Sequence, residues 1–162
     1  MSKFRQLIKG LGVAIGTGIN IFCIGHCAVE YGAEVTFLTG PSMIPTFNKT
    51  CSNNVVITEH ISTRWDMLEK GDVVISKSPV DPNSFVCKRI AAKAGDKVAR
   101  GDGMYGQSPN KYIKIPRGHV WLLGDNPDNS TDSREYGPVP LGLMRGRVCF
   151  KIWPLNEFGP VK

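Results

Sequence analysis

The sequence lacks the charge pattern of a nucleic-acid-binding protein. Its 162 residues carry a net charge of +6, yet no cluster of lysine and arginine is interleaved with aromatic residues. Lys3, Arg5 and Lys9 contribute three of the positive charges before residue 10, and the rest of the chain is only mildly basic. Because nucleic-acid binding needs a basic surface that follows the phosphate backbone, no nucleic-acid partner is expected.

The five cysteines form neither a zinc motif nor a disulfide framework. They are odd in number, and no two of them have the C-x-x-C spacing. Cys23, His26 and Cys27 would share one helical face, but a closed zinc site needs four ligands. Small side chains of an apolar helix explain this group better, so neither a metal nor a cofactor is predicted.

Charged residues are missing from position 10 to position 29, and this gap predicts one membrane span. A helix of twenty residues is about 30 Å long, close to the thickness of the hydrocarbon layer. The basic residues before it keep the tail on the side where the protein is made, or on the matrix side, with the bulk of the chain across the membrane. We therefore divide the chain into a basic tail over residues 1–9, a transmembrane helix over 10–30 and a β-rich domain over 31–162.

Two other interpretations of this segment stay open. A basic start and an apolar stretch also describe a cleaved signal peptide, although no convincing small-x-small cleavage site precedes residue 33. A buried helix of a soluble core is disfavoured, because the polar face of such a helix is missing. Gly12 and Gly16 form a G-x-x-x-G motif that lets a partner helix approach, but glycine is common in membrane helices anyway.

The remaining sequence lacks helical patterns, and its apolar runs are short. Turn residues such as Gly101-Asp102-Gly103 and Pro116-Arg117-Gly118 separate these runs. Residues 62–70 fit a short helix or a loop. Short strands at this spacing indicate a mostly β domain with a coiled or barrel-like antiparallel sheet. The expected strands are residues 34–39, 54–60, 72–76, 85–92, 97–99, 111–115, 119–123 and 147–153.

Ser42 is a candidate nucleophile. It lies between Pro41 and Pro45, in a loop that follows the strand expected to end at Thr39. Proline fixes φ, so this loop holds the hydroxyl in a defined direction. Met43 adds an apolar surface beside it. An ordinary proline-rich turn explains the same residues equally well.

Lys88 is the candidate base for this hydroxyl. On the expected strand it shares a face with Val86 and Ile90, whereas Arg89 points to the other face. An amine against valine and isoleucine is partly desolvated, and desolvation lowers its pKa. The pKa must fall from about 10.4 to near neutral for the amine to act as a base. The alternative is a lysine whose stem lies on the sheet while its ammonium group reaches water.

A polar loop over residues 124–134 follows the apolar run 120–123. Its short polar side chains suit a loop that hydrogen-bonds to itself. A lysine base needs a partner to aim it, and a serine hydroxyl can accept its N–H. Asp132 and Arg134 can pair and brace the loop. A solvated surface turn is the commoner use of such a sequence.

Taken in order, these runs resemble the signature of the type I signal peptidases, the serine/lysine family. The resemblance covers nearly the whole chain, including the N-terminal span. In detail the chain is similar to the mitochondrial members of this family. The segments that carry the family resemblance are 42–46, 71–74, 88–90, 95–96 and 124–134, and those that carry the mitochondrial one are 118–121, 129–134, 136–138 and 150–155.

The resemblance implies a sheet of the signal peptidase type and a serine endopeptidase activity. Ser42 would be the nucleophile and Lys88 the general base, with Ser130 orienting Lys88. Asp132 and Arg134 would support the site. Met43 would line the substrate cleft.

The resemblance also implies a cellular setting. It places the chain in the mitochondrial inner membrane, with the catalytic domain facing the intermembrane space. There it would remove N-terminal sorting presequences from precursor proteins, in a heterodimer with a second, related subunit. The first 29 residues contain no aspartate or glutamate, which is compatible with mitochondrial import.

One position departs from the family pattern. Some bacterial relatives carry a hydroxyl residue as an oxyanion donor two positions before the nucleophile, whereas this chain has Gly40 there. With Met43, Gly40 would bind the substrate. The backbone N–H of Ser42 then needs a second donor.

Two other functions stay open. One is a noncatalytic subunit that scaffolds or stabilises a related active subunit. The other is a self-cleaving regulator on a similar β-domain, which would need a DNA-binding or linker segment where this chain has its membrane-like span.

Overall fold

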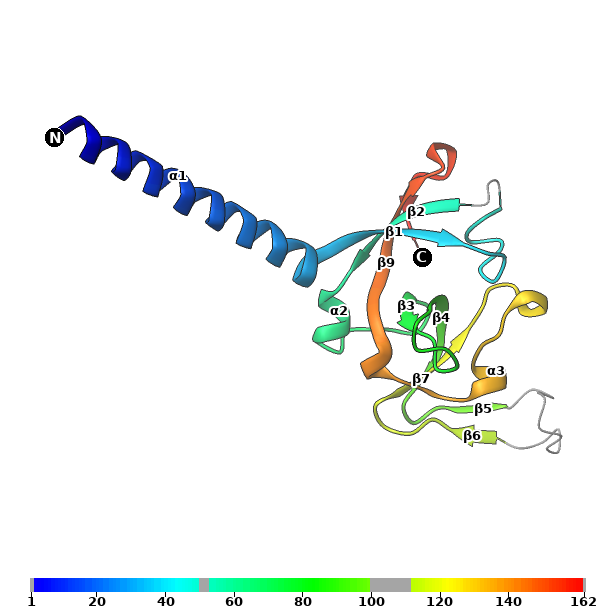
Figure 1. The fold of residues 1–162 in the computed structure, drawn as a ribbon. Helices are drawn as coiled ribbons and strands as arrows, with labels where there is room; N and C mark the ends of the chain where they lie inside the picture. The colour runs from blue at the N-terminus through cyan, green and yellow to red at the C-terminus, as the bar shows by residue number, and fades with distance from the viewer. Residues whose placement is uncertain (1, 50–52, 100–111, 162) are drawn as a thin grey trace.

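A long helix leads into the β-rich part of the chain. The computed structural model describes residues 2–49, 53–99 and 112–161. Helix α1 (Ser2–Cys27) continues into a π-helical turn (Ala28–Gly32), which runs directly into strand β1. Figure 1 shows α1 projecting away from the sheet, with the N-terminus at its far end.

This helix meets the requirements for a membrane span. The segment Gly10–Gly32 has a mean hydropathy of 1.6, and none of it is buried inside the protein. Over the described residues it is the one helix long and apolar enough to cross a membrane. The division into residues 1–9, 10–30 and 31–162 stays a prediction.

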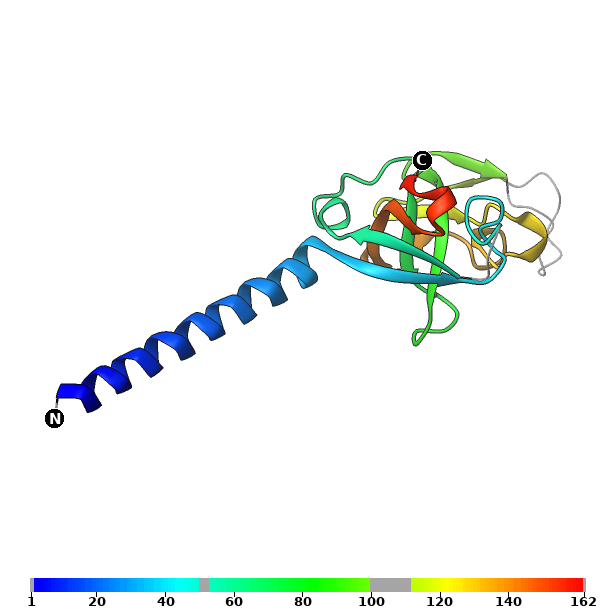
Figure 2. The ribbon, with the colours of Figure 1, turned by 90° about the horizontal axis from the view of Figure 1, so that it is seen from above.

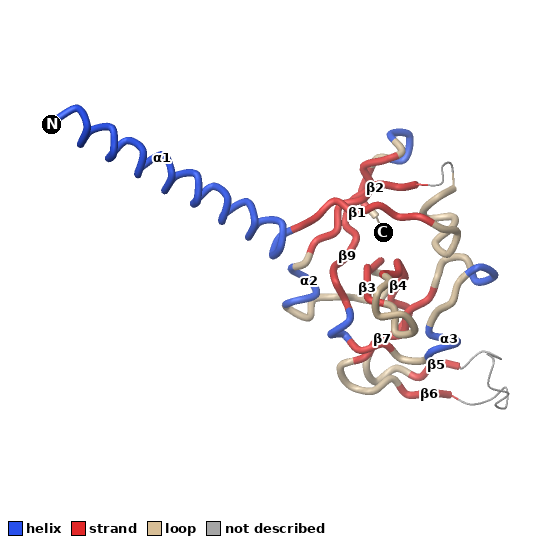
Figure 3. The backbone as a smooth tube through the Cα atoms, viewed as in Figure 1, coloured by secondary structure: helices blue, strands red, loops and turns tan. Residues whose placement is uncertain are grey.

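The rest of the chain folds into antiparallel sheets. Among the described residues, the main sheet has the strand order β1-β2-β9-β3-β4-β7-β8, with β10 beside β9, and β5 and β6 form a separate pair. Figure 3 shows these strands in red, curving around one another with short helices at the periphery. The strands are β1 (Ala33–Thr39), β2 (Asn53–Glu59), β3 (Val73–Lys77), β4 (Phe85–Lys93), β5 (Lys97–Ala99), β6 (Tyr112–Lys114), β7 (His119–Leu123), β8 (Val139–Pro140), β9 (Met144–Trp153) and β10 (Gly159–Pro160).

The predicted fold class, a mostly antiparallel β domain preceded by one helix able to span a membrane, is confirmed. Most strand bounds agree with the sequence prediction to within a residue, but β9 begins at Met144, three residues before the predicted start at residue 147. The strands β8 and β10 were not predicted, because two residues are too few to show alternation.

Two short α-helices, α2 and α3, lie in the connections between the described strands. The segment over residues 62–70 contains both predicted alternatives, since α2 (Ile61–Arg64) is followed by a loop. In the polar loop the chain forms α3 (Ser133–Tyr136), which was expected to be irregular. The predicted turn at residues 101–103 lies outside the described residues.

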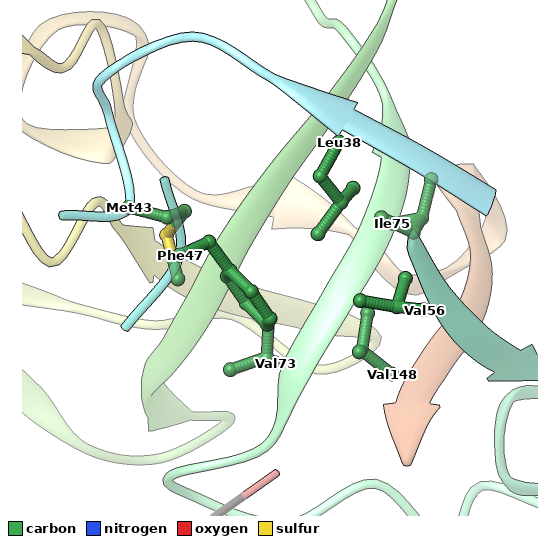
Figure 4. Close-up of a cluster of buried hydrophobic side chains, with 7 residues drawn as sticks. All are labelled: Leu38, Met43, Phe47, Val56, Val73, Ile75 and Val148. Carbon is green, nitrogen blue, oxygen red and sulfur yellow. The ribbon is translucent and has the colours of Figure 1, made fainter. Parts of the chain in front are cut away.

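One buried apolar cluster fixes the loop that follows β1. Met43 and Phe47 come from this loop, and they are 3% and 0% exposed. Burying a side chain of this size stabilises a fold by about 1.5–3 kcal/mol, so these two residues anchor the loop to the sheet. Figure 4 shows the cluster, which contains Leu38, Met43, Phe47, Val56, Val73, Ile75 and Val148.

Candidate active site

Ser42 lies on the loop over residues 40–48, which we call the Ser42 loop. Gly40 has φ of 94°, a conformation that favours glycine, and the chain leaves β1 there. The Phe47 N–H donates to the Met43 carbonyl at 2.8 Å and closes the turn. Ser42 is half-buried beside these anchors. Backbone conformation and apolar burial together therefore position its hydroxyl.

Lys88 lies near the middle of β4 and is 3% exposed. Ile90 is buried on the same face, as strand alternation predicts. Burial lowers the pKa of Lys88 below its ordinary value of 10.5, and the Asp132 carboxylate opposes this shift. Desolvation is the larger effect, so the structure favours a neutral amine more than water does.

Ser42 and Lys88 line the same cavity, which has a volume of about 140 Å³. Gly40 and Met43 also line it. In the described part of the chain, no hydrogen bond joins the Ser42 hydroxyl to Lys88. A larger cavity of about 500 Å³ lies elsewhere and contains neither residue. The chemistry of the lining, rather than the volume, therefore marks the candidate site.

Cys87 also lines this cavity, next to Lys88 in the chain. Burial raises the pKa of its thiol to about 12. Because the thiolate is the reactive form of cysteine, this side chain stays an unreactive thiol at neutral pH. Over the residues that the structure describes, no group of three or more histidine, cysteine or carboxylate side chains is placed to hold a metal ion.

Gly124 brings the polar loop against the Ser42 loop. A Cβ atom at position 124 would lie 2.1 Å from Ser130 Oγ and 2.6 Å from the Ser42 carbonyl oxygen, so only glycine fits. The Asn126 N–H donates to the same carbonyl at 3.0 Å, and its side-chain amide donates to the Pro41 carbonyl at 3.0 Å. The structure thus brings Ser130 and the Ser42 backbone together at the open side of one glycine.

Asp132 is the centre of the polar loop and is fully buried. It accepts hydrogen bonds from Ser130 Oγ at 2.9 Å, the Gly124 N–H at 3.0 Å and Arg134 Nε at 2.8 Å. Burial raises the pKa of Asp132, but the hydrogen bonds, led by that of Arg134, outweigh it and hold the pKa below its usual value. The Ser130 hydroxyl donates its one hydrogen to this carboxylate. The Ser130 oxygen can therefore still accept a hydrogen bond from another group.

A second ion pair connects the polar loop to the strand of Lys88, and the Ser42 loop joins it through Thr46. Arg89 donates through Nε and Nη2 to both carboxylate oxygens of Asp125, at 2.9 and 2.7 Å. The Thr46 hydroxyl donates to the same carboxylate, and Arg89 Nη1 donates to the Gly71 carbonyl at 2.7 Å. Sequence reasoning placed Arg89 opposite to Lys88 but missed its partners. The available signal for a role of Arg89 in the site was its position directly after Lys88 in the chain.

Lys151 on β9 also holds the Ser42 loop. Its position in an otherwise apolar strand was the one sign of this role that could be read from the sequence. It is 8% exposed, and its Nζ donates to the Thr46 carbonyl at 2.6 Å and to Glu157 at 2.7 Å. The same nitrogen lies 4.9 Å from the centre of the Phe47 ring. The start of the Ser42 loop is thus tied to the polar loop, and its end to β4 and β9.

Comparison with known proteins identifies the class of this chain. The family model described as signal peptidase, peptidase S26, matches residues 13–107 and 104–153. Mitochondrial inner membrane protease subunit 1 of Xenopus tropicalis is 46% identical over 163 residues, covering 98% of this chain and 92% of that protein. The human protein of the same description is 47% identical over 149 residues, with coverages of 90% and 84%.

Two further relatives are more distant. Subunit 2 of the mitochondrial inner membrane protease of Mus musculus is 33% identical over 153 residues, covering 93% of this chain and 81% of that protein. The crystal structure of a signal peptidase I from Enterococcus faecalis aligns with a TM-score of 0.40 and 21% identity, over 49% of this chain and 95% of that one.

These matches define a peptidase of the signal peptidase type. The chain belongs to the signal peptidase family, peptidase S26. The resemblance that the motifs indicated is therefore confirmed, including the likeness to the mitochondrial members of the family. The roles of Ser42, Lys88 and their neighbours stay predictions.

Replacing Gly124 with alanine tests whether the contact between the two loops matters. Because the new methyl group would overlap Ser130 Oγ and the Ser42 carbonyl, we expect the loops to separate and peptidase activity to fall on the order of 100-fold. Gly142→Ala is the matched control, since no atom lies within 4 Å of its added Cβ. Rates of precursor cleavage by the two variants give the comparison, and equal rates would contradict the proposed role of this contact.

Proposed function

We propose that this chain is a membrane-anchored serine endopeptidase that removes N-terminal sorting presequences from proteins delivered to the mitochondrial intermembrane space. The observation that carries the proposal is the shared cavity of half-buried Ser42 and buried Lys88. A serine hydroxyl beside a neutral amine is a nucleophile with its own base. The family and the names of the relatives support the peptidase activity.

The reaction begins with a proton transfer from the Ser42 hydroxyl to neutral Lys88. Ser42 Oγ then attacks the scissile carbonyl, and the backbone N–H of Ser42 stabilises the oxyanion. Gly40 supplies no side-chain donor, so a second donor must come from elsewhere, such as water or another backbone N–H. Because hydrogen bonds of a catalytic pair are often formed only in the substrate complex, the absence of a bond between Ser42 and Lys88 here fits this scheme.

The acyl-enzyme forms when the peptide bond breaks. Protonated Lys88 gives its proton to the leaving amine and becomes neutral again. It then activates a water molecule, which attacks the ester and releases Ser42. One amine thus serves as base and acid in both halves of the reaction.

Ser130 orients Lys88 in this scheme. A neutral amine has one lone pair, which must point at Ser42, so its N–H groups need an acceptor elsewhere. The Ser130 oxygen is free to accept, because its proton is donated to Asp132. The Asp132 carboxylate favours the charged form of Lys88. Arg134 pairs with Asp132 and so weakens this electrostatic effect on the pKa of Lys88.

The substrate binds as an extended chain. β1 has β2 as its one strand partner among the described residues and leads directly into the Ser42 loop, so an added strand can pair along its free edge. Met43 and Gly40 line the cavity, whose volume of about 140 Å³ selects small side chains next to the cut.

The membrane and a second chain complete the setting. Helix α1 anchors the protein in the mitochondrial inner membrane, and the β-rich domain faces the intermembrane space. Mouse subunit 2 is 33% identical to this chain, which supports a partner of the same fold in a heterodimer. The alternative is a noncatalytic, stabilising role in such a pair. Removing a single proposed catalytic group from this chain distinguishes the catalytic role from the stabilising one.

Substituting the two proposed reacting residues gives the direct test of function. Ser42→Ala and Lys88→Met should each lower precursor processing by roughly 10⁴-fold or more, because either change removes the nucleophile or its base. The purified full chain, with its partner subunit, is incubated with candidate precursors, and new N-termini are mapped by mass spectrometry. Lys97→Met, on the exposed face of β5, is the control and should process normally. Retained turnover by either active-site variant would contradict the mechanism.

The burial of Lys88 also predicts how stability depends on pH. Its folded-state pKa is below the unfolded value of 10.5, so between these values the unfolded chain binds more protons and stability rises with pH. Below the folded pKa the cost of burying the amine is constant and at its largest. We expect Lys88→Met to be more stable than the wild type at pH 7, with a difference that shrinks as the pH approaches 10.5.

Thermal unfolding of the two proteins in detergent across this pH range measures the difference. A wild type at least as stable as Lys88→Met at neutral pH would show that the amine is well solvated after all.

A further inference from the structure

A second cavity adjoins the one that contains Ser42 and Lys88. It has a volume of about 500 Å³, and Phe85 lines both cavities. We call it the basic cavity, because Arg64, Lys77 and Arg145 contribute to its lining. None of these three residues has a part in the proposed reaction.

The two cavities follow the same pair of strands. Leu38 and Thr39, at the end of β1, line the active-site cavity together with residues 85–88 of β4. Glu30, three residues before β1, lines the basic cavity together with Phe85, the first residue of β4. Every pairing from β1 through β2, β9 and β3 to β4 is antiparallel, so β1 and β4 run in the same direction. The basic cavity therefore lies at the start of both strands, and the active-site cavity lies further along them.

A substrate chain that pairs with β1 passes both cavities. Figure 2 shows β1 running from the end of α1 across the domain to the loop that carries Ser42. The strand has seven residues, and an extended partner with the same rise of about 3.3 Å per residue needs about as many to follow it. A substrate residue about five to eight positions from the cut therefore lies at the basic cavity.

The basic cavity has more positive than negative charge. Lys77 is exposed and has no hydrogen bond or ion pair within the described part of the chain. Arg64 donates to the Glu30 carbonyl at 3.3 Å, but no ion pair joins it to a carboxylate of the described residues. Arg145 is paired with Glu34 at 3.1 Å. Because Glu30 is the acidic residue of the lining, the cavity keeps an excess of positive charge.

Lys77 lies where the two cavities meet. It is the last residue of β3 and pairs with Phe85, the residue that both linings share. Side chains of directly paired residues lie on the same face of a sheet, with Cβ atoms about 4.5–5.5 Å apart. The long side chain of Lys77 can therefore extend past Phe85 toward a chain bound beside β4.

We propose that the basic cavity is a substrate subsite that binds an aspartate or glutamate side chain about five to eight residues from the cut, with Lys77 as its partner. This proposal rests on the proposed peptidase function and adds a feature of its substrates. Water and salt screen an attraction between exposed charges, so the subsite changes cleavage rates only modestly. It selects among precursors that fit the smaller active-site cavity equally well.

A charge scan of one peptide substrate tests the subsite. Glutamine replaces the charged residues of a precursor peptide over eight positions on each side of its mapped cut, and one glutamate or one lysine is then placed at each position in turn. The full chain, with its partner subunit, should cleave the glutamate peptide with a kcat/KM about fivefold above that of the lysine peptide when the charge meets the basic cavity. This preference should shrink in 1 M salt, where charges are screened within about 3 Å.

A charge reversal in the cavity identifies the residue responsible. Lys77→Glu should prefer the lysine peptide, because the subsite then attracts the opposite charge. Lys97→Glu is the matched control and should keep the preference of the wild type, since Lys97 is exposed on β5 and lines neither cavity. Both variants should cleave the neutral peptide at the rate of the wild type, which reports that folding and chemistry are intact.

The neutral peptide separates this proposal from the one on which it rests. If the wild type with its partner cleaves no candidate precursor, or if Ser42→Ala cleaves as the wild type does, the proposed function fails and the subsite fails with it. If the wild type cleaves the neutral peptide but has no preference for glutamate about five to eight residues from the cut, the subsite alone is overturned. A preference that Lys77→Glu leaves unchanged would also overturn it, because another group would then bind the carboxylate.

Discussion

The structure of the site depends on the burial of one amine. Lys88 is almost completely removed from water, and this desolvation is the largest influence on its pKa. Asp132 acts in the opposite direction, because its carboxylate stabilises the ammonium form. Arg134 reduces that effect by pairing with Asp132. The reactivity proposed for Ser42 is thus the outcome of a balance between an apolar environment and a buried, neutralised carboxylate.

The remaining contacts place the hydroxyl relative to this amine. Gly124 sets the approach of the polar loop to the Ser42 loop. The bond from Thr46 to Asp125 connects the end of the loop to Arg89, next to Lys88 on β4, and Lys151 holds the same end from β9. Hydrogen bonds to charged groups contribute about 1.5–3 kcal/mol, so these ties are strong enough to limit the motion of the loop. The polar loop and the strands β4 and β9 therefore converge on one short segment.

Much of this arrangement could be predicted from local sequence. Alternation along β4 predicted the buried face of Lys88, and the two prolines marked the Ser42 loop. The ties of Thr46 to Asp125 and Lys151 could not be predicted, because they join residues 79 and 105 positions apart. Such pairs depend on the strand order β2-β9-β3-β4, which no local period encodes. The glycine at position 124 looked like turn chemistry, and only the packed structure shows that it is a point of contact.

The charge state of Lys88 tests the central claim most directly. Selective isotope labelling of its side chain in the full chain, with the partner subunit present, allows the amine to be titrated by NMR. The account predicts a pKa below 10.5, with a neutral fraction at the pH where the peptidase works. An amine that stays fully cationic well into alkaline solution would contradict the account, because Ser42 would then have no base.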